Sequence, residues 1–119
     1  MPATTVDWKK LRPRVTRKLL GDLTQRIVQH FDPQKVILFG SYAYGRPTIE
    51  SDVDLFVIME STESVFARIG QVQEIAEVPF LPMDIIVRTP AEVTERLAMR
   101  DDFVKEILQK GRVLYERSK

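Results

Sequence analysis

The stretch "LFGSYAYGRPTIESDVDLF", residues 38–56, decides the fold of this chain, because it joins a glycine turn to two closely spaced aspartates. The turn, "GSYAYG" at residues 40–45, has the glycine spacing of a Walker phosphate-binding loop. Arg46 and Pro47, however, stand where that loop needs Lys followed by Ser or Thr. Pro47 would also end the long helix that a Walker loop must open. The turn is therefore predicted to hold an anion by a different design.

The segment before the turn, "KVILFG" at residues 35–40, is apolar and partly β-branched and ends in glycine. This pattern is typical of a buried strand that leads into a tight turn. Gly40 lets backbone N–H groups come close to an anion, and the Ser41 hydroxyl can donate as well from the start of a short helix. We therefore predict that Gly40 and Ser41 bind the triphosphate of a nucleotide.

The two aspartates open a second predicted strand, "DVDLFVIM" at residues 52–59. Because strand side chains alternate between faces, Asp52 and Asp54 share one face with Phe56 and Ile58. The opposite face takes the apolar residues Val53, Leu55, Val57 and Met59. Two like charges about 4 Å apart repel by roughly 4 kcal/mol at an effective dielectric of about 20, and a whole domain is stable by only about 5–15 kcal/mol. A cation is therefore expected between the aspartates, most simply Mg²⁺, which prefers hard oxygen ligands and leaves room for nucleotide phosphates.

A third carboxylate, Asp84, lies in the otherwise apolar run "FLPMDIIV", residues 80–87, whose later part is predicted to form a third strand. An unpaired carboxylate in such a run is costly, so Asp84 is expected either at the sheet edge or in the same acidic cluster. In the cluster, Asp52 and Asp54 would bind the Mg²⁺ that carries the β- and γ-phosphates, and Asp84 would serve a second Mg²⁺ at the attacking hydroxyl. Asp84 could also take the proton of that hydroxyl as general base.

Apolar residues at helical spacing predict helices at about residues 14–31 and 61–77. The sequence "TPAEV" starts a further helix at Thr89, with Glu92 in the reciprocal capping position, and C-terminal helices are expected over about residues 90–110. "RVLYE" at the end of the chain is expected to add a short last strand. This alternation predicts the α/β (α+β) class, with a small mixed β-sheet, helices packed on one face and a catalytic core at about residues 36–87.

Length and composition limit the possible functions. At 119 residues the chain is expected to form a single domain over residues 1–119, with no room for a second catalytic domain. Its net charge of +1 provides no global field for nucleic acid. The chain contains no cysteine, which excludes disulfides, thiolate metal sites and cysteine nucleophiles. No apolar run approaches the roughly 18 residues of a membrane span, so we expect a cytoplasmic protein without a membrane partner.

With these motifs in this order, the sequence resembles the minimal nucleotidyltransferases (MNT) of the DNA polymerase beta superfamily. The resemblance covers about residues 36–87 and lies in the Gly-Ser turn, the short helix, the Asp-x-Asp doublet and the carboxylate on a later strand. It implies a polymerase-beta-like nucleotidyltransferase fold. It also implies that the glycine-serine turn binds the triphosphate and that the three aspartates are metal ligands and catalytic residues.

One position departs from that pattern. Many relatives carry Arg between the Ala and the Gly of the turn, where this chain has Tyr44, and here Arg46 follows the glycine instead. Arg46 and Ser51 complete the set of expected nucleotide-binding residues with Gly40 and Ser41.

The resemblance implies a metal-dependent, adenylyltransferase-like enzyme that moves NMP, first of all AMP from ATP, to a hydroxyl acceptor. Small bacterial and archaeal relatives often accompany a helical HEPN-type ribonuclease, as antitoxins of a toxin-antitoxin pair that adenylylate it or cap it. The alternative function is therefore a non-catalytic module that caps such a partner. A partner or a second copy of the chain would also supply the wall of the nucleotide site that larger superfamily members build from an extra domain. Nucleic acid stays open as an acceptor.

Simpler interpretations also stay open for each motif taken alone. The glycine-serine turn could be a plain turn, and the Asp-x-Asp doublet could lie on a solvated edge. The basic residues Arg12, Arg14, Arg17 and Lys18 usually indicate a solvated helix face, although they could contact the acids of a partner or RNA. Trp8 could anchor either the N-terminal segment or a partner.

Overall fold

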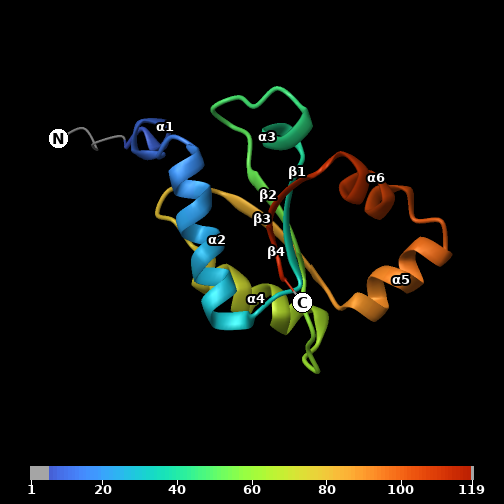
Figure 1. Ribbon diagram of the computed structural model, residues 1–119. Helices are drawn as coiled ribbons and strands as arrows, with labels where there is room; N and C mark the ends of the chain where they lie inside the picture. Colours follow the sequence, from blue (N-terminus) through green and yellow to red (C-terminus); the bar gives the residue numbers. More distant parts are fainter. Residues whose placement is uncertain (1–5, 119) are drawn as a thin grey trace.

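The computed structural model describes residues 6–118, and its strands form one mixed sheet (Figure 1). The strands are β1 (Lys35–Phe39), β2 (Val53–Ile58), β3 (Met83–Arg88) and β4 (Arg112–Glu116). They lie in the order β3-β2-β1-β4; β1 is antiparallel to β2 and to β4, whereas β2 and β3 are parallel. The predicted α+β class with a small mixed sheet is confirmed, and so are the positions of the predicted strands.

The described residues also form the helices α1 (Trp8–Leu11), α2 (Arg17–Phe31), α3 (Ser41–Tyr44), α4 (Val65–Ala76), α5 (Pro90–Ala98) and α6 (Asp102–Lys110). The sequence did not predict α1, which is a single turn. Side chains of Thr16 and Ser64 cap α2 and α4, each accepting a hydrogen bond from the backbone N–H three residues on. Both helices therefore begin a few residues later than their apolar pattern predicted. No helix among residues 6–118 has the length and apolar character needed to cross a membrane.

Helices cover both faces of the sheet, which corrects the expectation that they pack on one face. Figure 1 shows α2 and α4 on one side of the sheet and α5 and α6 on the other. The larger core lies on the first side, where Leu23 and Val72 of these helices meet strand residues such as Leu55. On the second side Ile107 of α6 packs in a cluster with Phe56. The reason is that β1 and β2 are apolar on both faces, so that leaving either face in water would be costly.

A partly buried ion pair fastens α4 to the start of α5. Arg68 Nη1 donates to Glu92 Oε1 at 2.6 Å, and the Arg68 side chain is only 8% exposed. The same carboxylate oxygen accepts the Thr89 N–H at 2.9 Å, which completes the capping box predicted from "TPAEV". The hydrogen bond from Arg68, followed by the one from Thr89, holds the pKa of Glu92 below its usual value.

Candidate active site

The topology brings the glycine turn and the three aspartates to the same end of the sheet. β1 ends immediately before Gly40, and β2, which is antiparallel to β1, begins immediately after Asp52. Because β3 is parallel to β2, its first residues, including Asp84, lie at that end as well. The single turn of α3 follows Gly40 at this end of the sheet (Figure 1).

Asp54 and Asp84 are direct neighbours across the parallel pair β2–β3. Asp52 lies two residues before Asp54 and therefore points to the same face. This is the face that Phe56 shares and that α6 covers further along the strands. Asp54 is half-buried, whereas Asp52 and Asp84 are exposed. Both expectations for Asp84 are met, because it lies on an edge strand and also belongs to the acidic cluster.

Crowding of negative charge marks Asp54 as the centre of this cluster. The pKa of Asp54 is raised to about 6, first by burial and then by the charges of Asp84 and Asp52. Near neutral pH the three carboxylates therefore repel one another, and a bound cation would relieve that repulsion.

Gly40 makes room for the Asp54 carboxylate. Its backbone has a φ of 70° and a ψ of −151°, a combination that is essentially restricted to glycine. A Cβ atom at this position would collide with the Asp54 side chain. The glycine is therefore needed twice, for the direction of the chain and for the close approach of the turn to the acidic cluster.

The donor set suits Mg²⁺. Carboxylate oxygens are its preferred protein ligands, and it is usually held by one or two carboxylates together with substrate phosphates rather than by an all-protein cage. Within residues 6–118 no group of three or more His, Cys, Asp or Glu side chains is already arranged to hold a metal ion. A metal ion at this cluster would therefore be held jointly by the carboxylates and the substrate phosphates.

The other expected nucleotide-binding residues have different surroundings. Ser41 follows Gly40 as the half-buried first residue of α3. Arg46 is exposed on the loop after that helix. Ser51 takes part in a turn of the same loop, because its hydroxyl accepts the Thr48 N–H at 2.8 Å and its own N–H donates to the Thr48 carbonyl at 3.0 Å. A nucleotide-binding role for Arg46 and Ser51 stays a prediction.

Arg12 is the residue near this site that sequence reasoning missed. Its guanidinium donates to the carbonyls of Ile49 and Ser51 and to the Tyr42 hydroxyl, the last at 3.2 Å. Arg12 therefore ties the N-terminal segment to α3 and to the loop that leads into Asp52. The solvated face expected for the basic residues 12–18 is wrong at this position, and nothing in the local sequence could show a partner nearly forty residues away.

The short helix α1 makes two further contacts near the same end of the sheet. Lys9 forms an ion pair with Glu50 at 2.8 Å, on the loop before β2. The Trp8 and Phe80 rings lie 5.5 Å apart between centroids, and Phe80 precedes β3 by three residues. Trp8 therefore anchors the N-terminal segment, although its side chain is still 62% exposed. Through these contacts α1 connects the segments that lead into both acid-bearing strands.

An aromatic pair borders the acidic cluster on the side of β1. Phe39 is the direct neighbour of Asp54 across the antiparallel pair β1–β2. The Phe103 ring of α6 meets the Phe39 ring edge-on, with 5.8 Å between their centroids, and Phe103 is 50% exposed. A partly exposed aromatic ring therefore packs on the strand residue that neighbours Asp54.

Comparison with known proteins agrees with this geometry. A family model described as polymerase beta, nucleotidyltransferase matches residues 22–119. The chain belongs to this nucleotidyltransferase family. Among solved structures, this nucleotidyltransferase is similar to the crystal structure of a proposed nucleotidyltransferase from Sulfolobus solfataricus, at 24% identity and a TM-score of 0.62. The match covers 87% of this chain and 82% of that one, and it supports the fold. A search of curated proteins found no significant match.

The N-terminal contacts of this nucleotidyltransferase lie outside the match to the family. Trp8, Lys9 and Arg12 all precede residue 22, where the match begins. The glycine turn and the three aspartates lie inside it. The resemblance inferred from the motifs is therefore confirmed at the level of the family, and the roles of the individual residues stay predictions.

Proposed function

We propose that this nucleotidyltransferase moves a nucleoside monophosphate, first of all AMP from ATP, onto a hydroxyl acceptor in a Mg²⁺-dependent reaction that releases pyrophosphate. The observation that carries the proposal is the register of β2 and β3, which sets Asp54 beside Asp84 with Asp52 two residues away. The fit of Gly40 against Asp54 supports it, and so does the family to which the chain belongs.

In the proposed reaction the acceptor oxygen attacks the α-phosphorus. The bond between that phosphorus and the α–β bridging oxygen breaks, and pyrophosphate leaves with the bonding electron pair. Asp84 is the proposed acceptor of the hydroxyl proton. Asp52, Asp54 and Asp84 would hold Mg²⁺, which supplies neutralisation of the phosphate charge. The Gly40–Ser41 turn would hold the triphosphate so that the leaving group lies in line with the attack.

ATP labelled in its α-phosphate tests this proposal directly. The wild type is expected to transfer label in the presence of Mg²⁺ to at least one of a panel of hydroxyl acceptors that includes proteins, RNA ends and small molecules. Asp54→Asn and Asp84→Asn are each expected to lower the rate by at least about a hundredfold, because each removes a charge that acts in the transition state. Asp22→Asn is the matched control, since Asp22 pairs with Lys18 on the exposed face of α2.

Two results would contradict the proposal. One is a wild type that transfers no label to any acceptor with either Mg²⁺ or Mn²⁺. The other is an Asp54→Asn variant that is as active as the Asp22→Asn control.

We also propose that a protein partner completes the site, most simply the helical HEPN-type protein that the family resemblance suggests, in a cytoplasmic toxin-antitoxin pair. Asp52 and Asp84 are exposed, which supports a site that lacks a wall, and Ile49 and Phe103, which are 56% and 50% exposed, offer apolar surface near the cluster for contact. The alternative is that this chain caps its partner without modifying it. Asp54→Asn separates the two: neutralisation of the partner is lost if transfer is required and kept if capping suffices.

A further inference from the structure

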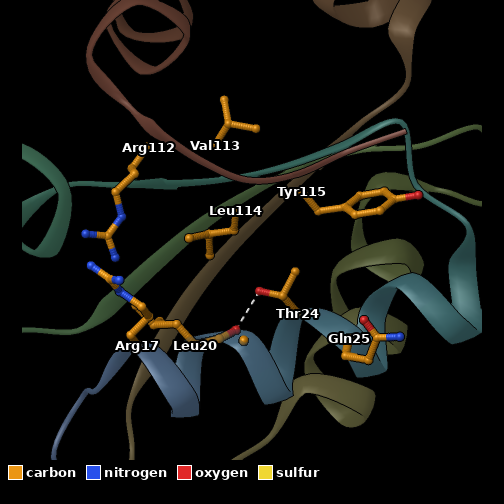
Figure 2. Close-up of a pocket in the computed structure, with 9 residues that line it drawn as sticks. Arg17, Leu20, Thr24, Gln25, Arg112, Val113, Leu114 and Tyr115 are labelled. Carbon is orange, nitrogen blue, oxygen red and sulfur yellow. Dashed lines mark hydrogen bonds between the residues drawn. The ribbon is translucent and has the colours of Figure 1, made fainter. Parts of the chain in front are cut away.

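A hollow of about 470 Å³ lies between α2 and the edge strand β4 (Figure 2). Its size falls within the roughly 300–1,000 Å³ that is usual for small-molecule sites. The hollow exists because β4 is the last strand of the sheet, so that no further strand from residues 6–118 fills the space beside the helix. Gly21 of α2 keeps the space open, since among the described residues a Cβ atom there would meet nothing within 4 Å beyond the adjoining backbone of its own helix.

Two arginines face each other at one end of this hollow. Arg17 comes from the first turn of α2 and Arg112 from the start of β4, and Figure 2 shows their guanidinium groups pointing toward one another. Within residues 6–118 neither arginine forms an ion pair with an Asp or Glu side chain. Both side chains are exposed, and two cations that point toward one another repel each other, a repulsion that an oxyanion between them would relieve. The planar guanidinium fork matches the oxygens of a phosphate particularly well.

The rest of the hollow is suited to an organic group. Leu20 and Leu114 form its apolar floor, and the Tyr115 ring lies toward the end opposite the arginines (Figure 2). The Thr24 hydroxyl donates to the Leu20 carbonyl at 2.6 Å, which leaves its oxygen as an acceptor. The Gln25 side chain adds an amide at the end where Tyr115 lies, away from the arginines. A bare phosphate would contact the arginines and leave this floor unused.

The hollow is separate from the acidic cluster. Leu114 and Tyr115 pack on the face of the sheet that belongs to the larger core, together with Leu20. Asp54 and Asp84 point to the opposite face, where Phe56 lies. A ligand in the hollow would therefore not occupy the proposed triphosphate position.

We propose that this hollow is a second ligand site, which binds an organic phosphate of about the size of a nucleoside monophosphate. The phosphate lies between Arg17 and Arg112, and the organic group covers Leu20 and Leu114 and reaches toward Tyr115. The proposal does not rest on the transferase function, because it uses none of the residues of the acidic cluster.

NMR titration with AMP, and separately with inorganic phosphate, tests the proposal. EDTA is present throughout, so that the aspartates cannot bind the nucleotide through a metal. AMP is expected to shift the backbone amides of residues 17–25 and 112–115, and to bind at least tenfold more tightly than phosphate. Arg17→Gln and Arg112→Gln are each expected to weaken AMP binding at least tenfold, whereas Arg14→Gln, an exposed arginine outside the hollow, leaves it unchanged.

A second variant tests the organic part of the site. Gly21→Leu places a side chain in the open space of the hollow and keeps both arginines. The substitution also favours the helix, because glycine is a weak helix former. It is expected to weaken AMP binding at least tenfold and to leave phosphate binding unchanged. Gly21→Ala, which strengthens the helix without filling the hollow, is the matched control and is expected to bind both as the wild type does.

Several outcomes would overturn the proposal. AMP binding that is unchanged in both arginine variants would do so, as would AMP that binds no more tightly than phosphate. Equal weakening by Arg14→Gln and Arg112→Gln would indicate diffuse surface charge instead of a site. Shifts centred on residues 40–54 would place the AMP at the acidic cluster.

Discussion

Among single residues, Asp54 departs most clearly from what stability alone would favour. A half-buried carboxylate beside two others is unfavourable in an otherwise apolar sheet, and its raised pKa of about 6 reports that cost. An apolar or amide side chain would fit β2 better, as Phe56 and Ile58 do further along the same face. Such strongly shifted groups gather at functional sites, which agrees with the role proposed for this cluster.

Asp54→Asn is expected to stabilise the metal-free protein at neutral pH. Because the pKa of Asp54 is raised from 3.8 to about 6 on folding, the wild type loses stability as the pH rises through that interval. Asparagine carries no charge, so the free energy of unfolding of the variant should exceed that of the wild type by about 1 kcal/mol at pH 7, with solvent screening allowed for. At pH 3.5 the two proteins should be equally stable. Urea unfolding in EDTA at the two pH values measures this difference. A variant that is less stable than the wild type at pH 7 would contradict the account.

Gly40→Ala is expected to damage both the fold and the site. The backbone conformation at Gly40 costs an alanine about 1–3 kcal/mol, and the added Cβ would also displace the Asp54 carboxylate. The free energy of unfolding from urea titration should fall by at least that amount. Gly21→Ala is the matched control, because Gly21 lies within α2 with open space around it, and that change should stabilise by about 0.5–1 kcal/mol. Equal effects of the two substitutions would refute the special role of Gly40.

Among the helices and strands, the N-terminal segment has the least expected role. Arg12→Ala is predicted to loosen the loop at residues 45–52, because it removes three hydrogen bonds to that loop and to Tyr42. At about 1 kcal/mol for each bond, amide hydrogen exchange in the loop should become at least about tenfold faster. Protection of β1 should stay as in the wild type. Arg14→Ala is the control, and loop exchange that is identical in the two variants would contradict a clamping role.

The junction of α4 and α5 depends on Glu92. Glu92→Ala removes the reciprocal cap and leaves the buried Arg68 without its partner, so the free energy of unfolding at pH 7 should fall by about 3 kcal/mol. The lowered pKa means that this contribution is present above the ordinary value of 4.5 and is lost as the pH falls through the folded-state value. The two proteins should therefore differ less in acid. Glu95→Ala, on the exposed side of α5, is the control; a loss as large as that of Glu92→Ala would argue against the ion pair.

Much at this level could be predicted because it is local. Alternation in "DVDLFVIM" placed each side chain of β2 on its correct face, and "TPAEV" contained the whole capping box. The Arg68–Glu92 pair could not be predicted, since it joins residues 24 positions apart whose helices meet only in the folded chain. The single turn of α1 was missed because four residues are too few to show a period.

For the molecule as a whole, the order of the motifs predicted which residues would meet but not how the layers are arranged. A strand, a glycine turn and a second antiparallel strand bring Gly40 to Asp54 almost by necessity. The position of Asp84 depended on β3 being parallel to β2 and in register, which the sequence left open. Helices on the second face were not predicted because Phe56 and Ile58 share that face with Asp52 and Asp54, so the mixed pattern of β2 did not show whether helices or solvent would cover it.

The fold explains why the acidic cluster is open and why a partner fits the proposal. Strand ends at one edge of a small sheet offer side chains but no enclosing wall, and α6 covers only the part of the face beyond the aspartates. The hollow between α2 and β4 lies on the opposite face. The two proposed sites can therefore be tested separately.

The central claim is that Asp52, Asp54 and Asp84 together hold a divalent metal with a nucleoside triphosphate. Electron paramagnetic resonance of Mn²⁺, titrated into the protein with a non-hydrolysable ATP analogue, measures this without requiring an acceptor. The account predicts that the wild type binds Mn²⁺ in the presence of the analogue and that Asp54→Asn and Asp84→Asn each weaken that binding by at least about tenfold, while Asp22→Asn does not. Mn²⁺ binding of equal strength in all four proteins would contradict it.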